Sequence, residues 1–172
     1  CVTLELLNKQ QADNAVFFIN PLPCAIDCAD AAGYPRSAHR IARRLFDPLM
    51  LRMNQEGYLN GHIQYSAVLA FIATGLAVLD HRQYIVLSNE DSSNETTVIG
   101  TEVNHQYSKS IEFERDFKAY VSSFITEDIV YFSLLRPWSE MKIARAFAKA
   151  TRYHKVFRSC NKGSKQNIWC GE

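Results

Sequence analysis

Residues 63–87 read IQYSAVLAFIATGLAVLDHRQYIVL, and this stretch decides the class of fold. Its first part, Ile63 to Leu79, is apolar but is interrupted by Gln64, Ser66 and Thr74. Because a membrane span needs about 18 nearly uninterrupted apolar residues, this part predicts a buried helix instead. Its last part, Tyr84 to Leu87, predicts a short strand buried on both faces of a parallel sheet. A helix that leads directly into such a strand favours an α/β fold.

The same alternation continues on both sides of this stretch. Further helices are predicted at Val2–Leu7, Ile111–Ile125 and Ser139–Ala150, and further strands at Ala15–Ile19, Ile129–Leu135 and Tyr153–Phe157. Residues 25–33 are compatible with a short helix or with a loop. Strands that alternate with helices predict a doubly wound, mostly parallel sheet flanked by helices. We expect residues 1–172 to form a single α/β domain of this kind, with ligands bound beyond the carboxyl ends of its strands.

The composition narrows the class of protein. Apolar residues make up 47% of the 172 positions, charged residues 22%, and the net charge is +1, so the chain as a whole is no polyanion binder. The cysteine count of five is odd and the spacing is wide, which argues against a disulfide scaffold and for a reducing compartment. The start of the chain shows no secretory signal. We expect a cytoplasmic protein without a membrane partner.

Two polar loops are candidate sites. The first, Ser88 to Ser93, follows a predicted strand and offers hydroxyl, amide and carboxylate groups that suit a magnesium-bound phosphate. The second, Asn104 to Ser110, has seven consecutive hydrogen-bonding side chains, including the titratable His105, Tyr107 and Lys109. For both loops the alternative is a solvated segment whose polar side chains cap the next turn or helix.

Two further segments carry weaker signals. The triplet Asn60-Gly61-His62 precedes a predicted helix, where free N–H groups favour an anion, although a structural histidine is the commoner reason for such a residue. The tail contains Cys160 and Cys170, half of the four ligands that a structural zinc site needs. The tail is also basic: Arg152, Lys155, Arg158, Lys162 and Lys165 could contact phosphate or nucleic acid, or form a solvated terminal face.

Several segments occur in an order that resembles one known family. They are Gly57–His62, Ser88–Ser93, Asn104–Ser110, Ser133–Pro137 and Arg158–Asn161, and together they span nearly the whole chain. They resemble the UDP-N-acetylmuramoyl-L-alanyl-L-glutamate epimerase family, called MurL, and the unbroken string from Asn104 to Ser110 is the most specific part. Asp91 stands where the family pattern has arginine, which reverses the charge at that position.

The resemblance implies a fold and its cofactors. The MurL family is similar to PP-loop ATPases, which have an adenine nucleotide alpha hydrolase-like fold and include 7-cyano-7-deazaguanine synthase. Those proteins bind the pyrophosphate of ATP in a Ser-Gly-Gly-x-Asp-Ser loop that precedes a helix like Val2–Leu7, and their zinc element continues beyond cysteines like Cys160 and Cys170. We therefore expect a chain that lacks pieces at both ends. ATP and magnesium are the implied cofactors, together with zinc at an incomplete site in residues 151–172.

The resemblance also implies a reaction. ATP would activate the terminal glutamate of UDP-N-acetylmuramoyl-L-alanyl-L-glutamate as an acyl-adenylate, and its centre would be inverted during peptidoglycan precursor synthesis. The implied catalytic residues are His105, Tyr107 and Lys109; nucleotide or magnesium would bind Ser88, Asn89 and Glu90; substrate would bind Asn60, Gly61, His62, Asn104 and Arg136. The alternatives are a PP-loop enzyme that modifies a nucleobase or tRNA, and an inactive fragment. With this small net charge, a nucleic acid is not the expected partner.

Overall fold

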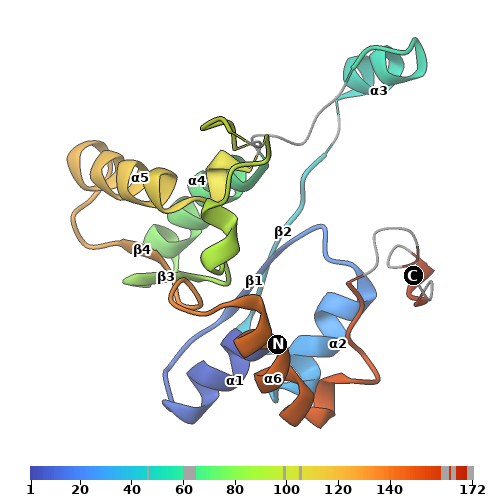
Figure 1. The fold of residues 1–172 in the computed structure, drawn as a ribbon, viewed down its shortest axis with the longest axis vertical. Helices are drawn as coiled ribbons and strands as arrows, with labels where there is room; N and C mark the ends of the chain where they lie inside the picture. Colours follow the sequence, from blue (N-terminus) through green and yellow to red (C-terminus); the bar gives the residue numbers. More distant parts are fainter. Residues whose placement is uncertain are drawn as a thin grey trace. The chain divides into compact units, whose positions relative to one another are not determined.

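The computed structural model describes residues 1–45, 47–59, 65–98, 100–104, 106–159, 163 and 166–169 (Figure 1). The chain divides into two compact units. Cys1–Leu45 and Met141–Glu172 form the first unit, and Phe46–Glu140 form the second. This division does not decide the prediction of a single domain, so each unit is described by itself.

The first unit combines both ends of the chain. Its helices are α1 (Val2–Lys9), α2 (Pro23–Ala31) and nearly all of α6 (Glu140–Lys149), with short 3-10 turns η1 (Arg36–Ala38) and η4 (Thr151–Tyr153). Strands β1 (Val16–Ile19) and β2 (His39–Ala42) pair in parallel, with Phe18 opposite Ile41.

The core of this unit is built around Tyr153, whose side chain is fully buried. It packs with Ala29, Ala32 and Tyr34. The Tyr153 hydroxyl donates a hydrogen bond of 2.8 Å to the carboxylate of Glu5 in α1. The first helix and the last turn therefore share one core although 148 positions separate the two residues.

The second unit holds the rest of the regular structure. Its helices are α3 (Pro48–Gln55), α4 (Tyr65–Leu79) and α5 (Ile111–Phe124), and its 3-10 turns are η2 (Asp91–Asn94) and η3 (Tyr107–Lys109). Strands β3 (Tyr84–Leu87) and β4 (Val130–Ser133) pair in parallel, with Leu87 opposite Ser133. The segments that follow these two strands therefore leave from the same edge of the sheet.

Alternation along the two strands explains the core of the second unit. Ile85 and Leu87 of β3 and Tyr131 of β4 share one face of the sheet, because side chains two apart in a strand point the same way. They pack against one cluster that includes Ala70 of α4 and Phe117 of α5. Figure 1 shows α4 and α5 beside β3 and β4.

The structure confirms the α/β class, the parallel pairing and most predicted elements. The strand Tyr84–Leu87 has the predicted bounds, and the predicted helix Ile63–Leu79 is confirmed from Tyr65 onward, since Ile63 and Gln64 lie outside the described residues. Among the described residues the strands form two separate two-stranded sheets rather than one larger sheet. The PP-loop type of fold stays a prediction.

One predicted strand is wrong and one observed strand was not predicted. Tyr153–Phe157 is no strand: η4 ends at Tyr153, whose carbonyl then accepts hydrogen bonds from the N–H groups of Val156 and Phe157 (3.0 and 2.8 Å). The three apolar residues are spaced i, i+3 and i+4, which is the spacing of neighbours on one face of a helical turn. Strand β2, in contrast, lies in an arginine-rich segment to which the sequence pattern assigned no element. Finally, no helix in the described part of the chain has the length and apolar character needed to cross a membrane.

Candidate functional site

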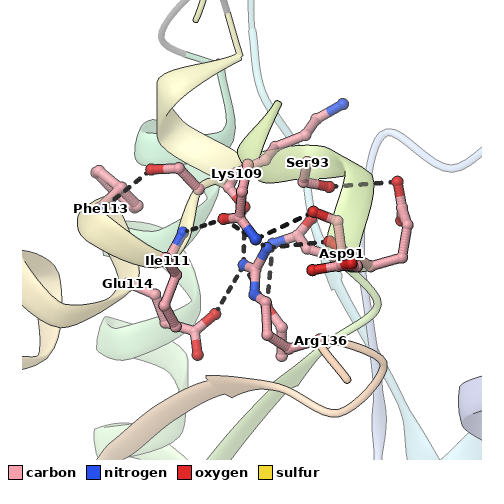
Figure 2. A network of polar contacts seen from close by, with 12 residues as sticks. Asp91, Ser93, Lys109, Ile111, Phe113, Glu114 and Arg136 are labelled. Carbon is pink, nitrogen blue, oxygen red and sulfur yellow. Dashed lines mark hydrogen bonds and ion pairs between the residues drawn. The ribbon is translucent and has the colours of Figure 1, made fainter. Parts of the chain in front are cut away.

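A polar network centred on Arg136 lies at the carboxyl ends of β3 and β4 (Figure 2). Arg136 is the third residue after β4. Its Nη1 donates to the backbone carbonyl of Glu90 (3.1 Å), and its Nη2 donates to the backbone carbonyl of Lys109 (2.8 Å). One guanidinium group therefore holds the segment that follows β3 against the segment that precedes α5.

A largely buried carboxylate balances this guanidinium. Glu114, in the first turn of α5, accepts from Arg136 Nη2 at 3.1 Å, and the side chains of Arg136 and Glu114 are only 14% and 12% exposed. Charge-assisted hydrogen bonds are stronger than neutral ones, and shielding from water strengthens them further. The pair thus ties the start of α5 to the segment after β4.

The segment after β3 is fixed by its own side chains. Asn89 Nδ2 donates to Ser133 Oγ on the neighbouring strand (3.1 Å). The Glu90 carboxylate lies 3.2 Å from the hydroxyl oxygens of both Ser92 and Ser93, and Ser92 Oγ also lies 3.0 Å from a carboxylate oxygen of Glu140. A hydroxyl has a single proton to donate. The arrangement that satisfies both carboxylates has Ser93 donating to Glu90 and Ser92 to Glu140.

The second predicted segment is joined to the first. Asn104 Nδ2 donates to the backbone carbonyl of Ser93 (3.0 Å), while its Oδ1 accepts from the N–H of Gln106 (2.8 Å). Lys109 Nζ donates to Gln106 Oε1 (2.9 Å). The two polar loops therefore form one connected surface region through Asn104 as well as through Arg136.

Tyr107 points to a different partner. Its hydroxyl donates to Asp116 Oδ2 (3.0 Å), and this hydrogen bond raises the pKa of the Tyr107 phenol. Tyr107 is 45% exposed, and its phenol keeps its proton at neutral pH. Its single proton lies in the hydrogen bond to Asp116.

The start of α5 is capped from within the chain. Ser110 Oγ accepts from the N–H of Phe113 (3.1 Å), and Asn94 Oδ1 accepts from the N–H of Ile111 (2.8 Å). Both bonds are drawn in Figure 2. For the loop Asn104–Ser110, the alternative interpretation was that its polar side chains cap the next helix, and Ser110 does so in the structure. These two N–H groups are consequently not available to a ligand.

Tyr131 lies below the network in the core of the second unit. Its hydroxyl is buried and has no hydrogen-bond partner among the described residues. Burial raises the pKa of Tyr131 to about 12, and the nearby Glu114 carboxylate contributes in the same direction. The phenol is therefore neutral throughout the physiological range.

The structure brings together several of the residues that the sequence singled out. Asn89, Glu90, Asn104, Lys109 and Arg136 belong to the connected network, and the exposed Ser88 lies directly after β3. His105, Asn60, Gly61, His62, Cys160 and Cys170 lie outside the described residues. Across the described ranges, no group of three or more His, Cys, Asp or Glu side chains is arranged to hold a metal ion. The predicted roles of all these residues stay predictions.

Sequence reasoning missed Glu114, although a signal was present. Glu114, Phe117 and Val121 are spaced i, i+3 and i+7, which places the carboxylate on the apolar face of α5. A carboxylate on a buried helical face is retained only with a partner, because an unpaired buried charge is costly. A carboxylate at that position indicates that a cation lies opposite it, and in the structure this cation is Arg136.

Comparison with known proteins gives a consistent result. A family model described as the MurL N-terminal domain matches residues 1–134. The UDP-N-acetyl-alpha-D-muramoyl-L-alanyl-L-glutamate epimerase of a Micromonospora strain is 37% identical over 98% of this chain, and that of Xanthomonas oryzae pv. oryzae is 39% identical over 99%. The match covers only 38% and 39% of those two relatives, so the chain spans well under half of their length. No solved structure matches the chain.

Proposed function

Because the chain belongs to the MurL N-terminal domain family, we propose that it forms part of an enzyme that inverts the glutamate centre of UDP-N-acetylmuramoyl-L-alanyl-L-glutamate in peptidoglycan precursor synthesis. The names of its relatives support the reaction. One structural observation supports the location: the Arg136 guanidinium joins the loop of Glu90 to the loop of Lys109 at the carboxyl ends of two parallel strands. Ligands of open α/β sheets bind at such edges.

The residues after β3 fit a magnesium ion. Magnesium prefers oxygen ligands and usually takes one or two carboxylates together with phosphate oxygens and waters. Ser88, Asn89 and Glu90 supply a hydroxyl, an amide oxygen and a carboxylate in sequence. The Glu90 carboxylate accepts a hydrogen bond from the Ser93 hydroxyl, which is neutral and leaves the negative charge of the carboxylate for a cation. We propose that these three residues hold magnesium on the phosphates of ATP.

ATP supplies activation in this scheme: transfer of its adenylyl group to the glutamate α-carboxylate, with release of pyrophosphate, removes the negative charge that makes the Cα–H hard to deprotonate. The chain's own residues then handle the proton. Inversion requires removal of the Cα proton on one face and delivery of a proton on the other, followed by hydrolysis that releases AMP. We propose His105, Tyr107 and Lys109 for these proton transfers, with the protonated Tyr107 phenol on the donating side.

The remaining expectations belong to the same proposal. Asn104, which lies in the network, and Asn60, Gly61 and His62 would contact the substrate. Two parallel strand pairs flanked by helices are compatible with a PP-loop ATPase type of fold in a cytoplasmic enzyme. A zinc site at Cys160 and Cys170 remains a prediction from the family resemblance.

The decisive test uses the full-length protein in deuterated water. With ATP, magnesium and the L-glutamyl nucleotide, we expect D-glutamyl product that carries deuterium at Cα and AMP in equal amount. Omitting ATP should abolish both. Glu90→Gln should lower turnover, whereas Glu56→Gln, which alters an exposed carboxylate in α3's C-terminal turn, should not. Unchanged chirality without deuterium at Cα would refute the epimerase assignment, and salt-sensitive binding of tRNA would favour the nucleic-acid alternative instead.

A further inference from the structure

The first unit has a cleft that the proposed proton-transfer residues do not use. It has a volume of about 430 Å³ and is lined by Phe147, Ala148, His154, Phe157, Arg158 and Trp169. Small-molecule sites are typically clefts of roughly 300–1,000 Å³ with apolar and aromatic walls and a few polar groups. The size and lining of this cleft match that description.

Aromatic rings form most of its walls. The ring centroids of Phe147 and Phe157 are 4.7 Å apart, and those of Phe157 and Trp169 are 6.1 Å apart. The interplanar angles of these two pairs are 52° and 43°, so the rings are inclined rather than stacked on one another. Trp169 is 51% exposed. Inclined rings with an exposed member leave ring surface on which a flat ligand can stack.

Arg158 adds a fixed hydrogen-bond donor. Its Nη1 donates to the backbone carbonyls of Lys155 (3.0 Å) and Phe157 (2.7 Å), which holds the planar guanidinium in place. Its Nε is buried and has no partner among the described residues. Since a buried donor without a partner is costly, an acceptor supplied by a ligand would stabilise this arrangement.

The sequence around the cleft is strongly basic. Residues 141–159 contain no aspartate or glutamate and six lysine or arginine residues, namely Lys142, Arg145, Lys149, Arg152, Lys155 and Arg158. Of these, Arg152 is paired with Glu5 (3.3 Å). Such a segment favours an anionic ligand. A purely apolar peptide side chain would gain nothing from this charge.

We propose that this cleft binds the base of a nucleotide. The base stacks against the rings of Phe157 and Trp169, Arg158 Nε donates to a carbonyl oxygen or ring nitrogen of the base, and the phosphates face the basic segment. This assignment rests on the proposed function only for the origin of the nucleotide, which is either the UDP group of the substrate or ATP.

The test uses Trp169 as its own reporter. The chain contains two tryptophans, so Trp138→Phe in the whole 172-residue chain leaves Trp169 as the single one. UMP, AMP and inorganic phosphate are titrated separately while Trp169 fluorescence is followed. We expect a saturable change with a nucleotide and none with phosphate. Saturation by UMP alone assigns the cleft to the UDP group, saturation by AMP alone assigns it to ATP, and saturation by both supports a base site that accepts either.

Two variants separate binding from folding. Arg158→Gln should weaken nucleotide binding roughly tenfold, the effect of one lost charge-assisted hydrogen bond, whereas Met141→Ala, at an exposed position of α6, should leave it unchanged. Trp169→Leu should also weaken nucleotide binding, which equilibrium dialysis of UMP and AMP measures without a tryptophan reporter. Because Trp169 is half exposed, this substitution is not expected to unfold the protein. No saturable change with either nucleotide, or the same change with phosphate alone, would overturn the proposal. These experiments measure nucleotide binding and not epimerisation, so failure of the base-site proposal is distinguishable from failure of the proposed epimerase function.

Discussion

Replacing Arg136 by methionine should destabilise the second unit far more than replacing a surface arginine. The substitution leaves the Glu114 carboxylate, 12% exposed, without its cation. It also deprives the carbonyls of Glu90 and Lys109 of a charged donor. Removing one partner of a buried ion pair costs about 3–5 kcal/mol, and each hydrogen bond to a charged group contributes about 1.5–3 kcal/mol. These contributions overlap, so we expect a loss of about 4 kcal/mol rather than their sum.

The matched control is Arg52→Met in α3. Arg52 pairs with Glu56 at 3.0 Å, a comparable distance, but these side chains are 74% and 49% exposed. An exposed i, i+4 pair contributes only about 0.3–0.5 kcal/mol. The two variants therefore remove the same kind of side chain and differ in burial and in the number of partners.

Urea unfolding measures the difference. With Trp169 replaced by phenylalanine, the fluorescence of Trp138 reports on the second unit alone, to which Trp138 belongs. Since urea slopes for small proteins are about 1–3 kcal/mol per molar, the midpoint of Arg136→Met should fall by roughly 2 M. Adding Glu114→Gln to Arg136→Met should recover part of the loss, because it removes the uncompensated carboxylate. Equal midpoints for Arg136→Met and Arg52→Met would refute the claim that the guanidinium holds the two loops together.

Three further outcomes follow from single contacts. Tyr131→Phe should leave stability at neutral pH unchanged or slightly higher, because the hydroxyl has no partner among the described residues. In the unchanged protein the folded-state pKa of Tyr131, about 12, lies above the unfolded value of about 10, so this group leaves stability unaffected below a pH of about 10 and lowers it as pH rises from there to about 12. Tyr131→Phe should therefore flatten the alkaline loss seen in denaturant titrations. Ser110→Ala should cost about 1 kcal/mol and speed hydrogen exchange at the Phe113 amide, which loses its cap. Tyr153→Phe should lower the stability of the first unit by about 1–2 kcal/mol, read from Trp169 in a Trp138→Phe background, because Glu5 loses a buried donor.

The elements predicted correctly are those with a clear periodicity. Tyr84–Leu87 is an uninterrupted apolar run between polar residues, and residues 111–125 repeat apolar side chains at helical spacing. Strand β2 has no such pattern, because Arg40 lies opposite Phe17 and Ile41 is 57% exposed. A strand with a charged residue and an exposed apolar one shows neither alternation nor a continuous apolar run, so sequence alone does not identify it.

The candidate site was predictable in its parts but not in its connection. The loops of Glu90 and Lys109 were recognisable as polar segments near predicted strand ends or helix starts. The contacts that join them run from the Arg136 side chain to two backbone carbonyls. Every residue has a backbone carbonyl, so the side chains of the two loops do not show which carbonyl accepts the hydrogen bond. The ion pair with Glu114 was the one part of this connection that left a signal in the sequence.

These contacts also bear on the role of Arg136 itself. The two Nη groups of Arg136 are engaged by Glu114 and by the carbonyls of Glu90 and Lys109, and a ligand that displaced any of these would leave a buried group without a donor. Its buried Nε–H has no partner among the described residues. Leaving a buried charge unpaired costs about 3–5 kcal/mol, more than a typical single charge-assisted hydrogen bond to a ligand returns. We therefore infer that Arg136 positions the two loops through its Nη groups, and its predicted contact with substrate, for which the Nε–H is the donor without a described partner, stays a prediction. Under the proposed function, the negative charge of phosphates would be met by magnesium at Glu90 or by another cation such as Lys109, whose ammonium group donates to the neutral amide of Gln106.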